Sequence, residues 1–233
     1  ASVKATMFDW LDSGQVPEGT PFFLFTHFMD PHDPYSAPES KDGGYGRKRM
    51  GDDPDPEEWR TTFQEAYIGE IEYLDGELGK FFQGLKDRGL YDDAVIILTA
   101  DHGEEFCEHG GWWHGQTLYN EQTHVPLMVK LPGNQRAGET NSHLARNLDI
   151  GPTALHFAGL AQGDMMQGQS LFNADLSDTN SSIAFAYSEN NFEGIVLQAV
   201  QNAQGMKIIR ANEGNKRNLK TLEGYDLNID PLE

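Results

Sequence analysis

Histidine and carboxylate residues gather in two stretches of the sequence, each directly after an apolar run. His32 follows residues 22–28, and the pair Asp101-His102 follows residues 94–99. The second stretch continues with Glu104, Glu105, Glu108, His109, His114 and His124. Imidazole and carboxylate groups together ligate divalent cations, and a protonated imidazole also holds the oxygens of an anion. The residue types therefore indicate a site for a metal ion, an anion or both.

The spacing of these residues excludes the common short metal motifs. The sequence has no His-Glu-x-x-His pattern, and its single cysteine, Cys107, has no partner for a structural zinc site. Residues 226–230 are similar to the start of a calcium loop, but Pro231 stands where such a loop needs glycine. Each histidine taken alone is explained better by a loop or packing role. The prediction of a site therefore depends on the convergence of these residues.

Three apolar runs have the pattern of strands that are buried on both faces, which is typical of parallel sheets. They are residues 22–28, 94–99 and 125–131. In an open α/β sheet, the loops that follow neighbouring strands converge outside the carboxyl ends of the strands. The loops with His32 and with Asp101-His102 follow the first two runs, so we expect them to meet there.

Helical periodicity separates the apolar runs. It covers residues 3–11, a long segment that starts with Asp55 as its cap and ends at Arg88-Gly89, and a shorter segment capped by Asp149. Strands that alternate with helices predict an α/β fold, with a mostly parallel sheet flanked by helices.

The pattern changes after about residue 160. Residues 183–187, 195–200 and 206–210 are short strand-like runs joined by turns that contain Asn and Gly. No helix between them is long enough to connect parallel strands, so we expect antiparallel pairing. The sequence therefore predicts an α/β part at residues 1–160 and a small antiparallel β subdomain at residues 161–233.

The composition excludes several classes of protein. The 233 residues are 38% hydrophobic, which is enough for a buried core, and a single cysteine cannot form an internal disulfide. No apolar run reaches the ~18 residues of a membrane span. The net charge is −20, from 17 Lys and Arg against 37 Asp and Glu, and such a surface repels nucleic acids and anionic membranes. Solubility explains most of this charge, and some carboxylates remain candidates to hold a cation.

Three segments resemble the sulfatases, a family of the alkaline-phosphatase-like superfamily. Residues 22–35 (FFLFTHFMDPHDPY) are similar to the family's PFFLFxHxMDPHxPY segment. Residues 99–105 (TADHGEE) are similar to its (S/T)DHGE segment, and residues 113–127 (WHGQTLYNEQTHVPL) to its HGxTLYxExxxVPL segment. Weaker similarity is found at residues 149–153 and 225–233. The segments occur in family order, which makes the resemblance specific.

The resemblance implies roles for four residues. Asp101 and His102 match two ligands of the active-site divalent cation, which is normally Ca²⁺, while the histidine nitrogen leaves Mn²⁺ and Zn²⁺ open. His32 matches the histidine that contacts the sulfate and the leaving-group oxygen. His114 stands where many sulfatases carry a lysine that neutralises the sulfate, and a protonated histidine can serve there with more dependence on pH.

Other polar residues are open between two roles. A structural role is favoured for His124. For His109, Glu104 and Glu105 two roles are equally compatible with the sequence, namely support of the metal ligands and a plain loop position. Asp30 either orients His32 or caps its turn, and the turn is favoured. A basic patch either contacts an anionic substrate or lies in a solvated loop, which is favoured; it consists of Arg47, Lys48 and Arg49.

The nucleophile segment of the sulfatases is not found in the sequence. The family takes its nucleophile from Cys/Ser-x-Pro-x-Arg, in which Cys or Ser becomes formylglycine, whereas Cys107 is followed by Glu-His-Gly-Gly. The resemblance therefore implies the C-terminal part of a sulfatase catalytic domain. We expect the parent protein to hydrolyse sulfate esters and the 233 residues alone to be inactive.

Two alternatives remain open at this point. Phosphonate and phosphodiester hydrolases and phosphoglycerol transferases of the same superfamily also carry Asp-His pairs. A protein of another class, a non-catalytic module that binds sulfated glycans or a partner, is also compatible with the sequence. The resemblance implies a sulfate-ester substrate, such as a sulfated carbohydrate, and an extracytoplasmic location. An unpaired strand edge favours a homo-oligomer.

Overall fold

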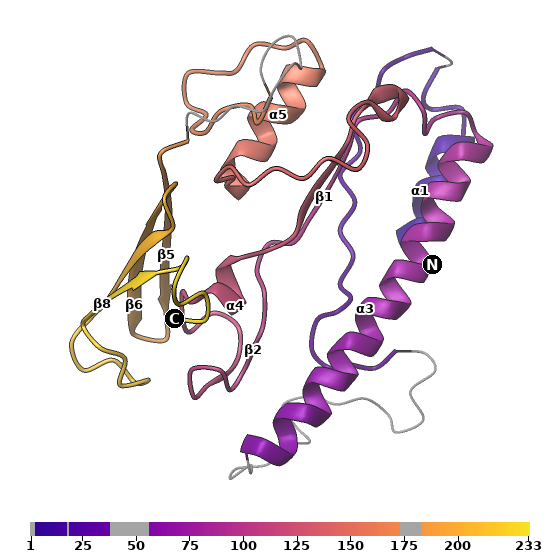
Figure 1. The fold of residues 1–233 in the computed structure, drawn as a ribbon. Helices are drawn as coiled ribbons and strands as arrows, with labels where there is room; N and C mark the ends of the chain where they lie inside the picture. Colours follow the sequence, from indigo (N-terminus) through magenta and orange to yellow (C-terminus); the bar gives the residue numbers. More distant parts are fainter. Residues whose placement is uncertain (1–2, 18, 38–55, 173–182) are drawn as a thin grey trace. The chain divides into compact units, whose positions relative to one another are not determined.

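The computed structural model describes residues 3–17, 19–37, 56–172 and 183–233. The chain divides into two compact units, Ala1–Asp93 and Ala94–Glu233, which we describe separately (Figure 1). No helix within these residues is long and apolar enough to cross a membrane. The predicted boundary near residue 160 is not tested by this division and stays a prediction.

The first unit is built on two helices, α1 (Val3–Asp12) and α3 (Pro56–Asp87), as the sequence predicted. The ring of Phe8 in α1 stacks on Phe81 in α3, with ring centroids 5.9 Å apart. After α3 the chain turns at Gly89, whose φ of +64° favours glycine. The predicted cap Asp55 lies outside the described residues, as does the basic patch.

The strand expected at residues 22–28 is not formed. A strand needs a hydrogen-bonded neighbour, and no described strand pairs with this segment. The side chains of Phe23 and Phe25 are 77% and 79% exposed, so the run is not buried on both faces. Phe28 still packs edge-on against Phe81 of α3, with ring centroids 6.3 Å apart. The apolar pattern therefore marks a segment that packs on a helix at some positions only.

In the second unit, two short strands close a long loop. β1 (Ile96–Thr99) pairs with β4 (Leu127–Lys130), with Thr99 opposite Leu127. The hydroxyl of Thr99 donates a hydrogen bond to the carbonyl oxygen of Pro126 at 2.9 Å. We call residues 100–126 the site loop. It contains β2 (Glu105–Phe106), β3 (Trp112–Trp113), which pairs with β2, and α4 (Asn120–Thr123).

The pairing of β1 with β4 corrects one expectation. All strand pairs among the described residues are antiparallel, so the parallel pairing expected for the apolar runs is not found within this part of the chain. The chain returns from β1 to the neighbouring strand through the site loop. The only helix in this loop is the short helix α4. The mixture of helices and strands agrees with the predicted α/β class.

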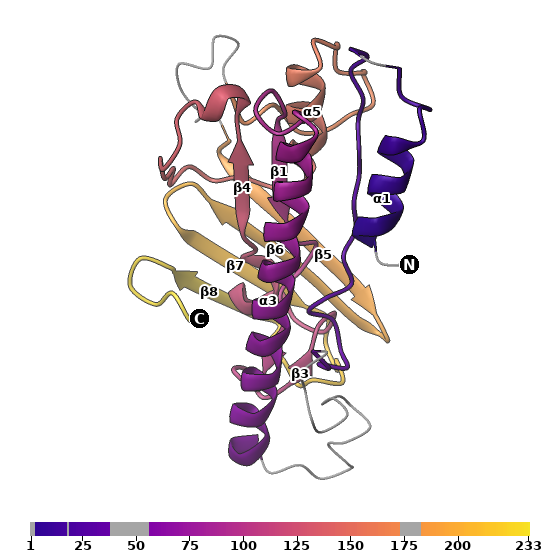
Figure 2. The same cartoon turned by 90° about the vertical axis from the view of Figure 1, so that its right-hand side faces the viewer.

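A four-stranded antiparallel sheet follows, in the order β5-β6-β7-β8 (Figure 2). Its strands are β5 (Phe185–Phe192), β6 (Ile195–Asn202), β7 (Met206–Ala211) and β8 (Leu222–Asp226). Alternate residues of β6 are buried, and they pack with Leu118 and Tyr119 of the site loop. The antiparallel C-terminal sheet is therefore confirmed, and its core is shared with the site loop.

A short helix, α5 (Ile150–Phe157), follows the 3-10 turns η1 (Pro132–Asn134) and η2 (Asn147–Asp149). Asp149 stands at the N-cap position of α5, as the sequence predicted, but its side chain makes no capping hydrogen bond to this helix. The carboxylate is fully buried and instead pairs with the guanidinium of Arg146 at 2.7 Å, and it accepts the N–H of Gln169. This carboxylate thus links the N-terminus of α5 to a later loop.

Candidate functional site

Asp101 and His102 lie in the turn that follows β1. One Asp101 oxygen, Oδ1, accepts the backbone N–H of His102 at 3.1 Å. The same oxygen lies 3.8 Å from Nε2 of the His102 ring. The other ring nitrogen, Nδ1, is 2.8 Å from the carbonyl oxygen of Gly103. Because a carbonyl only accepts hydrogen bonds, Nδ1 carries the proton of the neutral ring, and the lone pair is on Nε2. This tautomer is the one that a metal-ligating histidine needs.

The pair fits a divalent cation as part of its ligand set. The two donor atoms, Asp101 Oδ1 and His102 Nε2, lie 3.8 Å apart, and they would supply one oxygen and one nitrogen to a divalent cation. The side chain of Asp101 is 74% exposed, so the carboxylate is open to an ion. Within the described residues, no cluster of three or more His, Cys, Asp or Glu could hold a metal ion. This part of the chain therefore offers two ligands, one oxygen and one nitrogen.

His114 lies beside this pair. Its ring stacks on that of His102, with centroids 4.1 Å apart and planes inclined by 26°. Nδ1 of His114 is 2.9 Å from Oε1 of Glu104, a buried carboxylate. A carboxylate at this distance fixes the orientation of the ring and places the proton on Nδ1. The structure thus brings four of the expected residues together, including Glu104, for which the sequence left two roles open.

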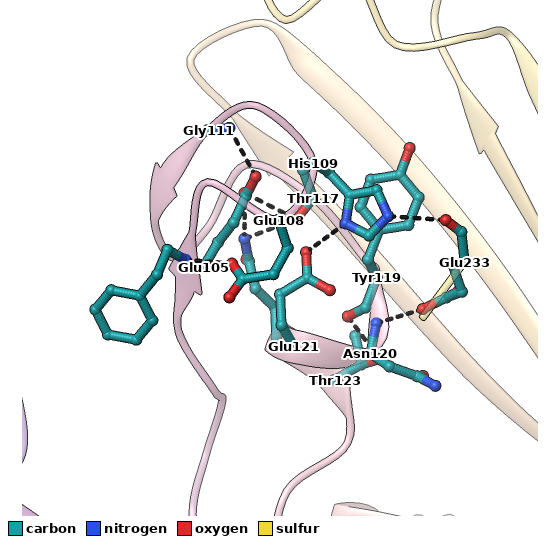
Figure 3. Close-up of polar contacts among 12 residues, drawn as sticks. Glu105, Glu108, His109, Gly111, Thr117, Tyr119, Asn120, Glu121, Thr123 and Glu233 are labelled. Carbon is teal, nitrogen blue, oxygen red and sulfur yellow. Dashed lines mark hydrogen bonds and ion pairs between the residues drawn. The ribbon is translucent and has the colours of Figure 1, made fainter. Parts of the chain in front are cut away.

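Behind these residues lies a buried ion pair that the sequence did not indicate. Glu105 is fully buried, and its two oxygens accept from the guanidinium of Arg217 at 3.0 and 3.2 Å. The N–H of Gly111 donates to Oε1 of the same carboxylate at 2.8 Å (Figure 3). Because Arg217 lies 112 positions from Glu105 in an Asn- and Lys-rich turn, no short motif could have found it.

His109 is a link within the fold. Its Nδ1 is 2.9 Å from Oε1 of Glu121 in α4, and its Nε2 is 3.1 Å from the backbone oxygen of Glu233 (Figure 3). Both partners present oxygen atoms to the ring nitrogens, so these two contacts favour the protonated form of the ring. Burial acts to lower the pKa of His109, but the hydrogen bonds to Glu233 and Glu121 outweigh it and raise the pKa. The ring also stacks on Tyr119, with centroids 3.7 Å apart.

A second buried ion pair joins the sheet to α4. Nζ of Lys207 in β7 lies 2.8 Å from Oε1 of Glu233, and the backbone N–H of Asn120 donates to the other oxygen. Burial lowers the pKa of Lys207, although the Glu233 carboxylate partly offsets this effect. Lys207 lies in a run that the sequence predicted as a strand. As with Arg217, the sequence did not indicate that this cation is buried.

The remaining expected residues lie apart from this cluster or in the other unit. The side chain of His124 is exposed at the end of α4. His32, in the first unit, is exposed and has Nδ1 2.7 Å from the carbonyl oxygen of Asp33. Asp30 interacts with the buried carboxyl of Glu70 in α3. The expected meeting of His32 with the Asp101-His102 pair stays a prediction.

Solved structures give the class of this fold. The chain matches the phosphonate monoester hydrolase of Agrobacterium radiobacter with a TM-score of 0.76 and 22% identity, over 99% of this chain and 54% of that one. A structure in complex with its substrate D-glucosamine-2-N,6-O-disulfate matches with a TM-score of 0.64 and 25% identity, over 74% of this chain and 35% of that one. The protein therefore has the alkaline-phosphatase-like α/β fold, and the predicted fold class is confirmed.

The sequence models of two families match the chain. One, described as Sulfatase, covers residues 2–160, and the other, described as N-sulphoglucosamine sulphohydrolase, C-terminal, covers residues 107–233. The chain belongs to the sulfatase family, as the sequence resemblance predicted.

Individual relatives support this assignment. N-acetylglucosamine-6-O-sulfatase of Bacteroides thetaiotaomicron is 32% identical over 114 residues, which cover 48% of this chain and 20% of the relative. Lipoteichoic acid synthase 1 of Bacillus subtilis is 29% identical over 230 residues, which cover 90% of this chain and 32% of the relative. The chain spans from a fifth to less than half of the length of curated relatives that it matches.

Proposed function

We propose that the protein is a sulfuric ester hydrolase, in which Asp101 and His102 ligate a divalent cation and His32 and His114 hold the sulfate. The observation that carries the proposal is the position of the His102 ring, whose Nδ1 is 2.8 Å from the Gly103 carbonyl oxygen and whose Nε2 is 3.8 Å from Asp101 Oδ1. Membership of the sulfatase family supports it. A cation held there supplies positive charge against the negative charge that develops on the sulfate oxygens.

The histidines share one feature that suits this chemistry. In His32, His102 and His114, Nδ1 faces an oxygen acceptor of the protein, so Nε2 is the nitrogen that meets the substrate or the metal. From Nε2, protonated His114 donates to a sulfate oxygen, and His32 delivers a proton to the leaving-group oxygen. Glu104 holds His114 in this orientation.

The site residues named above do not include a nucleophile. We propose that it is a hydrated formylglycine in a Cys/Ser-x-Pro-x-Arg segment outside these 233 residues. One of its hydroxyl oxygens attacks the sulfur atom, and the bond between sulfur and the ester oxygen breaks as the alcohol leaves with the proton from His32. The 233 residues alone then have little or no turnover. Clear sulfate-ester hydrolysis by the purified 233-residue chain would contradict this part of the proposal.

The activity is tested with the protein expressed from its native gene. The assay measures release of sulfate from aryl sulfates and from sulfated sugars, for the wild type and for His102→Ala and His114→Ala. We expect each variant to lose at least about 10²-fold in kcat/KM, the range of a lost general acid or charge-stabilising group. His143→Ala, at an exposed histidine, is the matched control and should retain wild-type activity.

Metal binding has its own test, which does not depend on turnover. Calorimetric titration with Ca²⁺, Mn²⁺ and Zn²⁺ compares the wild type with Asp101→Asn, which removes the charge and keeps the shape. We propose Ca²⁺ as the ion, and the nitrogen of His102 leaves Mn²⁺ and Zn²⁺ as alternatives. Asp164→Asn, at an exposed carboxylate, is the control. Equal affinities in wild type and Asp101→Asn would exclude the proposed ligand.

A second function is favoured by one comparison. Lipoteichoic acid synthase 1 is similar over 90% of the chain, so transfer or hydrolysis at phosphorus by the same fold is the alternative. Parallel assays with phosphonate monoesters, phosphodiesters and sulfate esters separate the two functions. A kcat/KM for a phosphorus ester that exceeds the value for every sulfate ester would replace the sulfatase proposal.

The substrate class and the compartment are further parts of the proposal. The structural neighbour bound to D-glucosamine-2-N,6-O-disulfate supports a sulfated carbohydrate as the substrate. We also propose an extracytoplasmic location, which cell fractionation tests directly. The homo-oligomer predicted from unpaired strand edges is tested by light scattering of the purified protein.

A further inference from the structure

We propose that Gln122 is a positioning residue that sets His114 against the Asp101-His102 pair. The inference rests on the proposed function, because it concerns the geometry of the same site. Gln122 is the third residue of α4, and it is only 5% exposed. Neither the sequence motifs nor the family resemblance singled it out.

Two hydrogen bonds connect Gln122 to the two turns that carry the site. Its backbone oxygen accepts the N–H of Gly103, the residue directly after His102, at 2.9 Å. Its side-chain oxygen Oε1 accepts the N–H of Gly115, the residue directly after His114, at 2.9 Å. One residue therefore holds both turns, each at the position next to its histidine.

The other end of the side chain fixes the orientation of the amide. Nε2 of Gln122 donates to the hydroxyl oxygen of Thr117 at 2.7 Å, and it also faces Oε2 of Glu105 at 3.2 Å and the backbone oxygen of Trp113 at 3.3 Å. A rotated amide would point its oxygen at the Glu105 carboxylate and its hydrogens at the Gly115 N–H. The buried environment therefore permits only one orientation, and Oε1 has to face Gly115.

The approach of α4 to the first turn is close enough to demand glycine. A Cβ atom on Gly103 would lie 2.1 Å from the backbone oxygen of Glu121, far inside van der Waals contact. The Gly103 N–H reaches Gln122 only because the two backbones touch here. The backbone of α4 is thus closely packed against the Asp101-His102 turn. The side chain of Gln122 extends from this position and binds the His114 turn, so the two turns are held relative to one another.

The stacking of His102 on His114 is the feature that this arrangement controls. The two rings come from residues 12 positions apart, and their centroids are 4.1 Å apart. The Glu104 carboxylate orients the ring of His114, but it comes from the same strand end as His102 and does not fix the His114 backbone. In the absence of the Gln122 side chain, the Gly115 N–H loses its buried acceptor. The bond from Asn190 Nδ2 to the Gly115 carbonyl oxygen remains, so we expect the His114 turn to be less firmly positioned.

The test is Gln122→Met, which has nearly the same length and volume and has no hydrogen-bonding amide. Gln135→Met, at an exposed glutamine, is the matched control. The first readout is the nuclear Overhauser effect between the ring protons of His102 and His114 in the folded protein. We expect it to be lost in Gln122→Met and retained in Gln135→Met. Retention in both variants overturns the inference, whatever the activity of the protein.

The second readout separates positioning from general stability. We expect kcat/KM to fall about 10- to 100-fold in Gln122→Met, the range for residues that support a site from behind. The loss should not add to that of His114→Ala in a double-mutant cycle, because both act on the same group. The affinity for the divalent cation should change less than kcat/KM, since the backbone bond to Gly103 remains. Additive losses would overturn the positioning role.

A milder variant keeps the inference testable if Gln122→Met does not fold. Thr117→Val removes the hydroxyl that accepts from Gln122 Nε2 and leaves Gln122 itself in place. We expect a weaker His102–His114 Overhauser effect and a smaller loss of kcat/KM in the same direction, and an unchanged effect contradicts the inference. If His114→Ala retains full activity, the proposed function of His114 fails, whereas loss of the Overhauser effect in Gln122→Met still supports the positioning.

Discussion

The loops that carry the two groups of proposed site residues are held in different ways. In the first unit, the turn with His32 is held on α3 by Tyr35, which is 1% exposed and packs edge-on against Phe63 and Tyr67, and by the hydrogen bond from the Ser36 N–H to Glu70. In the second unit, the site loop is held by buried charges and hydrogen bonds around Glu105 and Gln122. Aromatic packing fixes position but tolerates rotation, whereas hydrogen bonds also fix direction. Directional hydrogen bonds therefore hold the loop with Asp101, His102 and His114 to a greater extent than the turn with His32.

The largest expected effect comes from breaking the buried ion pair of the site loop. Arg217→Ala leaves the Glu105 carboxylate buried without its counter-charge, which should destabilise the second unit by about 3–5 kcal/mol. Chemical denaturation measures the change. Because the chain has two units, native-state hydrogen exchange of the site-loop amides is the more specific readout.

The matched control for this prediction is a surface ion pair. Arg136→Ala removes the pair with Glu139, which is partly exposed, and should cost no more than about 1 kcal/mol. If both arginine variants cost the same, the buried network does not stabilise the site loop more than a surface pair does.

An intermediate effect is expected from the aromatic contact in the first unit. Tyr35→Leu retains an apolar side chain but loses two edge-on ring pairs, each worth about 0.5–1.5 kcal/mol, so the unit should lose about 1–3 kcal/mol. Hydrogen exchange of α3 and the His32 turn measures the loss. Protection of the site-loop amides should be unaffected, and a matching loss there would mean that the two loops are not stabilised independently.

A smaller and pH-dependent effect is expected at His109. Its folded-state pKa is raised above the unfolded value, so its stabilising contribution is present below the ordinary pKa of about 6.5 and is lost as pH rises through the raised pKa. We therefore expect His109→Asn to be less stable than the wild type at pH 6, with a difference that shrinks towards pH 9. Unfolding free energies over this range test the prediction, and a difference that grows with pH would contradict it.

The smallest effect is expected at Glu70, a carboxyl that joins α3 to the His32 turn. Burial raises the pKa of Glu70, the Ser36 N–H partly offsets this, and Asp30 raises it further. A raised carboxyl pKa means that stability falls as pH rises through it. Glu70→Gln cannot ionise, so its stability relative to the wild type should increase from pH 4 to pH 8. A relative stability that decreases over this range would show that the ionised carboxylate is the stabilising form.

Much of the fold was readable from the sequence because the relevant signals are local. The 3.6-residue period of α3 and the turn at Gly89 depend only on neighbouring residues, and so does the alternation in β6. The run at residues 22–28 misled because an apolar run cannot show whether a partner strand is within reach. Likewise, periodicity does not distinguish the antiparallel pairing of β1 with β4 from parallel pairing.

The candidate site was predictable in its chemistry but not in its support. Asp101, His102 and His114 were found because histidine and carboxylate residues cluster after an apolar run, and because these positions match sulfatase motifs. Gln122, Arg217 and Lys207 were missed because a polar residue on a helix, turn or strand reads as solvent-facing until its neighbours are known. The role of such residues comes from burial, which depends on the whole fold.

The β1–β4 ladder also bears on how this site can change. Because Thr99 and Leu127 are opposite one another, the site loop leaves the sheet and returns to it at the same place. Lengthening a loop with fixed ends costs only about 0.6 kcal/mol for each doubling of its length. Insertions that reshape the surroundings of the site therefore cost little stability, and the pairing of β1 with β4 continues to fix the two ends of the site loop.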